Sequence, residues 1–300
     1  MSDRQPYIGG LSLEVLVKLV RVGPHGEERP AVLGADGRWF DISEVSADLD
    51  GAFLAGDGIA EVSARLASGD LPQLKEQPTR FGPPIARPGK IVCIGVNYRD
   101  HAAESGLSVP TEPVLFLKAP DTVIGPDDDI LIPRRSTKTD YEIELAAVIG
   151  QTARYLDNPE QALEHIAGYT IAHDVSEREF QLERGGQWDK GKNCETFNPL
   201  GPWLVTKDEI PDPQTLDLRL TVNGSTRQES STKQMIFGVA EIVHYLSQFM
   251  VLHPGDVINT GTPSGVALGH PEPKPYLRPG DVVELEISGL GRQRQTVGQA

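Results

Sequence analysis

Residues 140–150 constrain the fold of this 300-residue chain more than any other segment, because their sequence, DYEIELAAVIG, alternates in the way a β-strand does. One face of the predicted strand is apolar throughout. The other face begins with carboxylates and then becomes apolar at Ala146 and Val148. We therefore expect a central strand that is buried at one end and gathers carboxylates at the other.

Glu142 and Glu144 lie on the same face of this predicted strand, about 7 Å apart at a rise of roughly 3.3 Å per residue. Two like charges so placed repel each other unless a cation or water separates them. A hard divalent cation with oxygen ligands is one solution, and a half-exposed strand with solvated glutamates is the other. This segment alone leaves both interpretations open.

The composition excludes several kinds of partner. The formal net charge is −15 and no run of lysine or arginine is present, which disfavours a nucleic-acid partner. No apolar run approaches the roughly 20 residues that span a bilayer, and the first residues, MSDRQPYIGG, lack the apolar core of a signal peptide. Cys93 and Cys194 are far apart and fit free thiols in a reducing compartment. We expect a cytoplasmic protein with no membrane partner.

A proline- and glycine-rich stretch at residues 77–90 predicts two units, a small one over residues 1–85 and a larger one over 86–300. In the small unit, residues 13–21 are strand-like, Asp36-Gly37 predicts a hairpin, and residues 43–71 have a helical pattern. This α/β unit has no cluster of catalytic residue types. We interpret it as a packing or dimerisation element.

The larger unit begins with a buried strand at residues 91–96 and a short helix at 98–105. His101 and Glu104 are spaced i, i+3 and therefore share a face of that helix. Such a pair can activate a water as a general base, although an exposed polar face has the same spacing.

A second strand, at residues 168–174, ends at Asp174, and Ser176 and Glu179 have the spacing of a capping box for a following helix. Asp174 is thus either presented to a site or a plain helix cap. A long glycine-rich segment, residues 181–203, follows, and its tryptophans predict an ordered loop. Further on, residues 257–265 predict a strand that enters a turn rich in hydroxyls and glycines, which could bind a carboxylate.

Five ordered motifs together resemble the fumarylacetoacetate hydrolase family over roughly residues 85–290. They are GVNYRDHAAE at 95–104, PVLFLK at 113–118, YEIEL at 141–145, DVSER at 174–178 and TGTPSG at 260–265. The resemblance implies a β-rich α+β fold with a mixed, rolled sheet and few helices, preceded here by the small N-terminal unit.

The resemblance also implies roles for individual residues. Mg²⁺ or Mn²⁺ is expected on Glu142, Glu144 and Asp174, and a His101–Glu104 pair is expected to activate water. Lys192 is expected to reach the reacting carbonyl, and the family implies a homodimer. Four further residues are candidates for binding a 2-oxo acid substrate: Arg178, Gln181, Lys118 and Thr262.

The segments ERGGQWDKGK at 183–192, MIFG at 235–238 and YLSQF at 245–249 resemble the branch that contains 2,4-diketo-3-deoxy-L-fuconate and -rhamnonate hydrolases. This branch predicts hydrolysis of the C3–C4 bond of a 2,4-diketo acid, giving pyruvate and a carboxylic acid such as lactate. Three alternatives stay open: a tautomerase or isomerase, an oxaloacetate-type decarboxylase that uses the same metal site, and a binding protein without catalysis.

Overall fold

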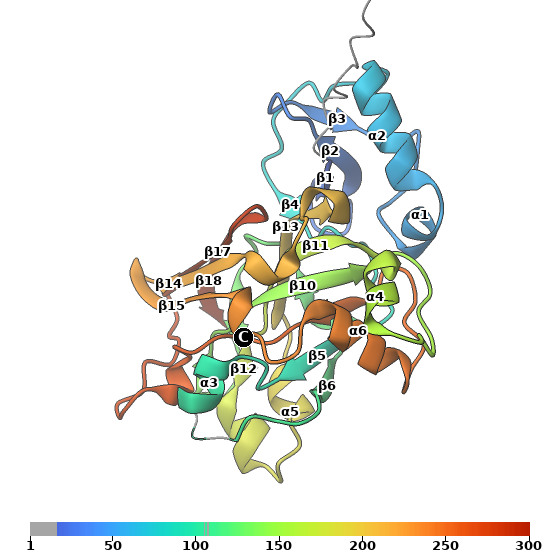
Figure 1. Cartoon of the computed structure of the whole chain (residues 1–300). Helices are drawn as coiled ribbons and strands as arrows, with labels where there is room; N and C mark the ends of the chain where they lie inside the picture. The colour runs from blue at the N-terminus through green and yellow to red at the C-terminus, as the bar shows by residue number, and fades with distance from the viewer. Residues whose placement is uncertain (1–16, 105, 107) are drawn as a thin grey trace, which may run out of the picture.

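A computed structural model describes residues 17–104, 106 and 108–300, and it has the β-rich α+β fold that the sequence predicts. Figure 1 shows the N-terminal strands with α1 and α2 at one end of the molecule and α3 and α5 at the other. The strand expected from residue 13 begins at Lys18, and residues 13–16 lie outside the described part.

Within the described residues, eleven strands form the largest sheet, and β10 lies near its middle. Its order is β3 (Trp39–Asp41), β2 (Arg29–Leu33), β1 (Lys18–Val22), β13 (Asn198–Thr206), β11 (Ile166–His173), β10 (Ile143–Ile149), β16 (Val257–Asn259), β5 (Ile91–Gly95) and β6 (Val114–Lys118), with β4 (Phe81–Gly82) on β1 and β7 (Val123–Ile124) on β13.

A second sheet packs against the first, and helices α1, α2 and α6 contribute to the hydrophobic cores. Its order is β15 (Ser225–Ser231), β14 (Asp217–Val222), β17 (Val282–Ile287), β18 (Gly291–Gln299) and β8 (Ile130–Ile132); β9 (Thr139–Asp140) pairs separately with β12 (Ser176–Glu177). The helices are α1 (Gly51–Ala55), α2 (Gly58–Ser68), α3 (Arg99–Glu104), α4 (Pro159–Ala162), α5 (Asp189–Lys192) and α6 (Val239–Ser247).

Strand β10 is buried on both faces, which explains the apolar end of its sequence pattern. Ile143 and Leu145 belong to the core shared with β14, β17 and α6. Ala146 and Val148 belong to a second core that includes Phe53 and Val62 of the N-terminal helices. The strand is therefore held from both sides, and its first residues are fixed in position.

The N-terminal unit extends the central sheet. Strand β1 pairs antiparallel with β13, with Lys18 opposite Val205 and Leu19 opposite Leu204. Arg80 adds an ion pair to Asp128, on the loop before β8, at 2.7 Å. Residues on either side of the predicted boundary near 85 thus share one sheet and one core.

Several local predictions are confirmed, and two need correction. The predicted hairpin at Asp36-Gly37 forms, with Gly37 at positive φ, and Asn223-Gly224, which has the same type of sequence, joins β14 to β15 with Gly224 at positive φ. The predicted capping box is wrong: Ser176 lies in β12, and its hydroxyl donates to the Asp174 carbonyl at 3.0 Å. A π-helical turn over Glu179–Glu183 follows. The chain also continues past β17 into β18, which the sequence analysis did not predict.

No helix in residues 17–104, 106 and 108–300 combines the length and apolar character needed to cross a membrane.

Candidate active site

The three predicted metal ligands come together at the ends of β10 and β11. Glu142 directly precedes β10, Glu144 is its second residue, and Asp174 directly follows β11. The antiparallel register pairs Ile143 with His173, and the Asp174 amide donates to the Glu142 carbonyl at 3.0 Å. One oxygen from each carboxylate lies within 4.8 Å of the others, and all three side chains are buried.

Buried cations surround two of these carboxylates. Lys192 of α5 donates to Glu142 Oε2 at 2.8 Å and to Asp174 Oδ2 at 2.7 Å. Arg178 binds the other Glu142 oxygen at 2.6 Å, and Lys118 of β6 binds the other Asp174 oxygen. Glu144 differs, since it has no ion-pair partner among the described residues and accepts a hydrogen bond from the Gly261 amide at 2.7 Å.

This arrangement shifts the pKa values of Glu142 and Glu144 in opposite directions. Burial alone would raise the pKa of Glu142, but the charges of Lys192 and Arg178 outweigh burial and lower its pKa to about 2. Burial, together with the charges of Asp174 and Glu142, holds the pKa of Glu144 well above its usual range. Ionisation of Glu144 is therefore disfavoured in the protein alone, because no cationic side chain pairs with it among the described residues.

The donor set fits a hard divalent cation. It offers three carboxylates within reach of one ion, and Mg²⁺ and Mn²⁺ prefer oxygen ligands. A cation there would be the positive partner that Glu144 lacks among the described side chains. Glu142, Glu144 and Asp174 would hold the ion, while Lys192, Arg178 and Lys118 fix the carboxylates of Glu142 and Asp174 in position.

The predicted His101–Glu104 pair forms on α3. His101 Nδ1 lies 3.5 Å from Glu104 Oε2, at the outer limit of a hydrogen bond. Both Glu104 oxygens accept from the Gly265 amide at 3.0 Å. Burial raises the pKa of Glu104, but the hydrogen bond to His101, the Gly265 amide and the charges of His101 and His270 outweigh burial and lower its pKa. Glu104 is thus anionic and able to orient the His101 imidazole.

A cavity of about 50 Å³ brings the ligands and His101 together. The polar part of its lining contains the carboxylates. The apolar wall is formed by Ile94, Val96, Phe116 and Trp188, and the Lys192 ammonium lies 4.9 Å from the centre of the Phe116 ring. Trp188 packs so closely over β5 that a Cβ on Gly95 would lie 2.6 Å from its ring. The cavity suits a small molecule with one polar and one apolar end.

Three of the four predicted substrate contacts line this cavity: Arg178, Gln181 and Thr262. Lys118 does not line it. Lys118 is 1% exposed, and its ammonium pairs with Asp174 and donates to the Phe197 carbonyl at 2.6 Å. The prediction of a substrate contact is therefore corrected, because Lys118 contacts a metal ligand and does not line the cavity.

Two residues of the site were not assigned a role from the sequence. Asp140 is fully buried and accepts from Arg178 Nε at 2.8 Å. Trp188, which the sequence indicated only as a sign of an ordered loop, forms the apolar wall. Asp140 could have been found from the sequence, because it lies in the same acidic segment as Glu142 and Glu144. No sequence signal places Trp188 over Gly95.

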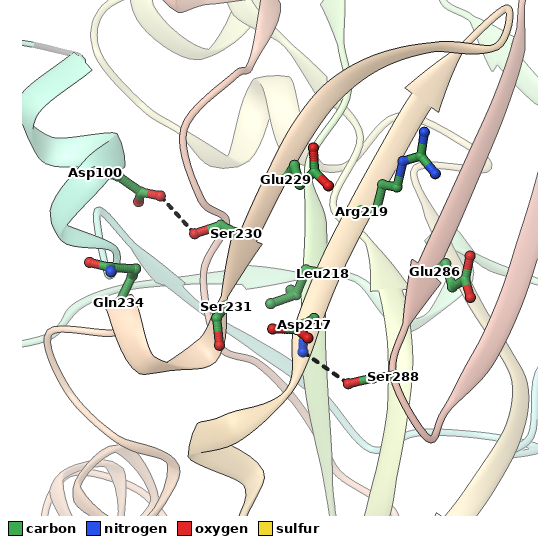
Figure 2. A pocket seen from close by; sticks show the side chains of 10 residues that line it. All are labelled: Asp100, Asp217, Leu218, Arg219, Glu229, Ser230, Ser231, Gln234, Glu286 and Ser288. Atoms are coloured by element: carbon green, nitrogen blue, oxygen red, sulfur yellow. Dashed lines mark hydrogen bonds between the residues drawn. The ribbon is translucent and has the colours of Figure 1, made fainter.

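A larger hollow, of about 720 Å³, lies on the outer face of β14, β15 and β17 (Figure 2). Asp100 of α3 reaches its rim and accepts a hydrogen bond from Ser230 at 2.8 Å. None of its lining residues lines the small cavity, and its carboxylates are spread over several strands. The small cavity is therefore the candidate active site, because acidic, basic and imidazole groups converge there.

Comparison with known proteins agrees with this geometry. Residues 90–298 match the family description Fumarylacetoacetate (FAA) hydrolase C-terminal. The chain belongs to the fumarylacetoacetate hydrolase family. A Burkholderia multivorans protein, named as a hydrolase with no substrate given, is 51% identical over 279 residues, which cover 93% of this chain and 98% of that protein.

Solved structures of this family resemble the chain over nearly its whole length. The fumarylacetoacetate hydrolase from Exiguobacterium antarcticum is 36% identical with a TM-score of 0.82, over 95% of this chain and 100% of that one. Maleylpyruvate hydrolase from Sphingobium sp. SYK-6 is 27% identical with a TM-score of 0.77, over 94% and 100%. A 2-hydroxyhepta-2,4-diene-1,7-dioate isomerase from Mycobacterium marinum is 30% identical with a TM-score of 0.72, over 94% and 98%.

Proposed function

We propose that this enzyme hydrolyses the C3–C4 bond of a 2,4-diketo acid and depends on Mg²⁺ or Mn²⁺. The observation that carries the proposal is the convergence, on one small cavity, of three buried carboxylates, a buried lysine and a histidine backed by a glutamate. The reaction adds water to the C4 carbonyl and breaks the C3–C4 bond. C3 takes a proton, and the products are pyruvate and the carboxylic acid of the acyl part.

The divalent cation, when bound, supplies Lewis-acid stabilisation of the negative charge that develops on the 2-oxo acid part. His101 is the residue of its pair that lines the cavity, so it is the group that takes a proton from water. Glu104 lies behind it and holds the imidazole in orientation, because its carboxylate is itself fixed by the Gly265 amide.

Lys192 serves as a positive charge rather than as a base or a covalent nucleophile. Burial alone would lower its pKa, but the carboxylates of Asp174 and Glu142 outweigh burial and raise it. Its ammonium therefore stays protonated and can stabilise an oxyanion on the attacked carbonyl. Arg178 and Gln181, which are hydrogen-bonded to each other at 3.0 Å, offer donors to the substrate carboxylate.

The acyl part would face the apolar wall of Phe116 and Trp188. Two kinds of acyl group are candidates. The motifs at 183–192, 235–238 and 245–249 favour 2,4-diketo-3-deoxy-L-rhamnonate or -fuconate. The apolar wall favours a short alkyl acylpyruvate such as acetylpyruvate. Both share the 2,4-diketo acid that the reaction needs.

An isomerase is the second candidate function. The observation that favours it is the similarity to a solved 2-hydroxyhepta-2,4-diene-1,7-dioate isomerase. The same site could protonate an enolate without adding water. An oxaloacetate-type decarboxylase would form that enolate by losing carbon dioxide.

The test is to incubate the enzyme and Mg²⁺ with acetylpyruvate, the two sugar acids and oxaloacetate in ¹⁸O-labelled water. Pyruvate together with a labelled carboxylic acid supports the hydrolase. An isomer alone, or carbon dioxide without an acid product, would overturn it in favour of the second candidates. Lys192→Met is expected to lower kcat by about 10²–10³. The control Lys190→Met, which changes an exposed lysine of the same helix, is expected to leave kcat unchanged.

A further inference from the structure

The carboxylate of Glu104 extends from α3 onto a separate segment, residues 265–270. Both of its oxygens accept from the Gly265 amide at 3.0 Å. At the other end of the segment, a Cβ on Gly269 would lie 2.4 Å from Glu104 Cδ and 2.6 Å from Oε1. A side chain at residue 269 would therefore displace the Glu104 carboxylate from this position.

The same carboxylate also contacts the histidine of its pair. Glu104 Oε2 lies 3.5 Å from His101 Nδ1 on α3, while the Gly265 amide of the segment donates to both Glu104 oxygens. The segment therefore contacts the residue that orients the imidazole.

The segment is tied to the metal-ligand side of the site through Asp140. Asp140 Oδ1 accepts from the Ala267 amide at 2.7 Å, and Oδ2 accepts from the Leu268 amide at 3.0 Å. The same carboxylate pairs with Arg178 at 2.8 Å, and Arg178 binds Glu142 at 2.6 Å. An unbroken series of contacts thus runs from a metal ligand to Glu104.

We propose that residues 265–270 form the positioning element of the His101–Glu104 pair: Asp140 anchors the segment to the metal-ligand side, the Gly265 amide holds the Glu104 carboxylate, and Gly269 leaves room for it. This inference rests on the proposed hydrolase function for its kinetic consequence. Its structural consequence, the environment of Glu104, does not depend on turnover. Asp140, Gly265 and Gly269 are positioning residues, because none of them lines the cavity.

The first test compares Gly269→Ala with Gly56→Ala. Neither glycine has a positive φ, and a Cβ on Gly56 would meet only a carbonyl oxygen at 3.5 Å. Gly269→Ala is expected to lower kcat by about 10- to 10²-fold, the cost of misplacing a catalytic group by about 1 Å. KM and the Kd for Mn²⁺, measured by titration calorimetry, are expected to stay within about twofold, as in Gly56→Ala. Equal kcat in the two variants would overturn the proposal.

The second test needs no substrate and separates this proposal from the proposed function. The side-chain carboxyl of Glu104 is followed by ¹³C NMR in ¹³C-glutamate-labelled protein, and its signal is assigned by its loss in Glu104→Gln. Gly269→Ala is expected to shift this signal, because the added Cβ displaces the carboxylate that the Gly265 amide holds, whereas Gly56→Ala is expected to leave it in place. An unshifted signal in Gly269→Ala would overturn the role of Gly269. Inactivity of the wild-type enzyme on every diketo acid would instead overturn the proposed function and leave this comparison of signals informative.

Discussion

The two sides of the cavity are built in opposite ways. The metal-ligand side consists of carboxylates at the ends of adjacent strands, fully buried and held by Lys118, Lys192 and Arg178. The base side consists of a six-residue helix, α3, whose Glu104 is held mainly by one backbone amide of a distant segment. Charge pairs fix the first side, and backbone donors and close packing fix the second.

This difference indicates which side controls metal affinity and stability and which side controls the rate. Ion pairs buried in the sheet couple ligand geometry to the stability of the whole fold, because breaking one leaves an unpaired charge. The backbone hydrogen bonds that hold Glu104 of α3 can be altered with little effect on the core. Changes on the metal-ligand side should therefore affect metal affinity and stability together, whereas changes on the base side should affect rate alone.

The largest expected effect is loss of the metal. Extensive chelation is expected to abolish activity, and Mg²⁺ or Mn²⁺ is expected to restore it. Glu144→Gln removes the carboxylate that lacks a cationic partner and should weaken Mn²⁺ binding strongly, since a hard cation loses a charged ligand. Calorimetric titration measures this affinity. Full activity in metal-free protein would contradict the assignment of this side.

Glu104→Gln should affect the rate and leave metal affinity unchanged. It keeps the shape of the side chain and removes its charge, so kcat is expected to fall by about 10²–10⁴. The Kd for Mn²⁺ should stay within about twofold, because Glu104 is not one of the three ligands. Reduced metal binding with normal kcat per bound metal would show that Glu104 belongs to the metal-ligand side.

Lys118→Met tests the link between the metal-ligand side and stability. The variant leaves Asp174 with one buried partner fewer and is expected to lower the free energy of unfolding by about 3–5 kcal/mol. Lys138→Met is the control, because its pair with Glu183 is largely exposed, and it should cost only about 0–1 kcal/mol. Urea unfolding of both variants measures the difference. Similar losses of unfolding free energy in the two variants would contradict a larger contribution of the buried Lys118 pair to stability.

The smallest expected effect concerns pH. Burial, the main cause, lowers the pKa of His173 to about 4, below the value of about 6.5 in an unfolded chain. Between about pH 4 and pH 6.5, the unfolded chain therefore binds one more proton at His173 than the folded protein does. The contribution of His173 to stability is therefore complete above about pH 6.5 and is lost as the pH falls towards 4.

Between pH 7 and pH 5 this loss should be about 2 kcal/mol, and His173→Gln should be free of it. Urea unfolding of metal-free wild type and variant at both pH values gives the difference. A pH dependence that is the same in both proteins would contradict the assignment.

The sequence predicted the metal-ligand side well because its determinants are local. Strand alternation placed Glu142 and Glu144 on one face, and the strand pattern placed Asp174 at the end of the next strand, while their role as metal ligands came from the resemblance to the family. The contacts of Glu104 depend instead on Gly265 and Gly269, which are more than 150 residues away along the chain. No periodicity encodes such an approach, since it follows from how α3 packs on a distant turn.

The same reason explains the misplacement of Lys118 and the missed capping geometry. A lysine at the end of a strand can serve a substrate or a buried carboxylate, and only the packing of β6 beside residues 174–175 decides between them. Ser176 has the spacing of a helix cap, but pairing of β12 with β9 overrides that local preference.

The pairing of β1 with β13 has a consequence for any shortened form of this enzyme. If residues 86–300 were produced alone, the stretch of β13 around Leu204 and Val205 would lose its neighbouring strand. Its backbone donors and acceptors would become an open edge beside apolar side chains, which is the kind of surface that recruits other chains into aggregates. The N-terminal strands thus cover this edge, and insolubility of a shortened protein should not be mistaken for a defect in the active site.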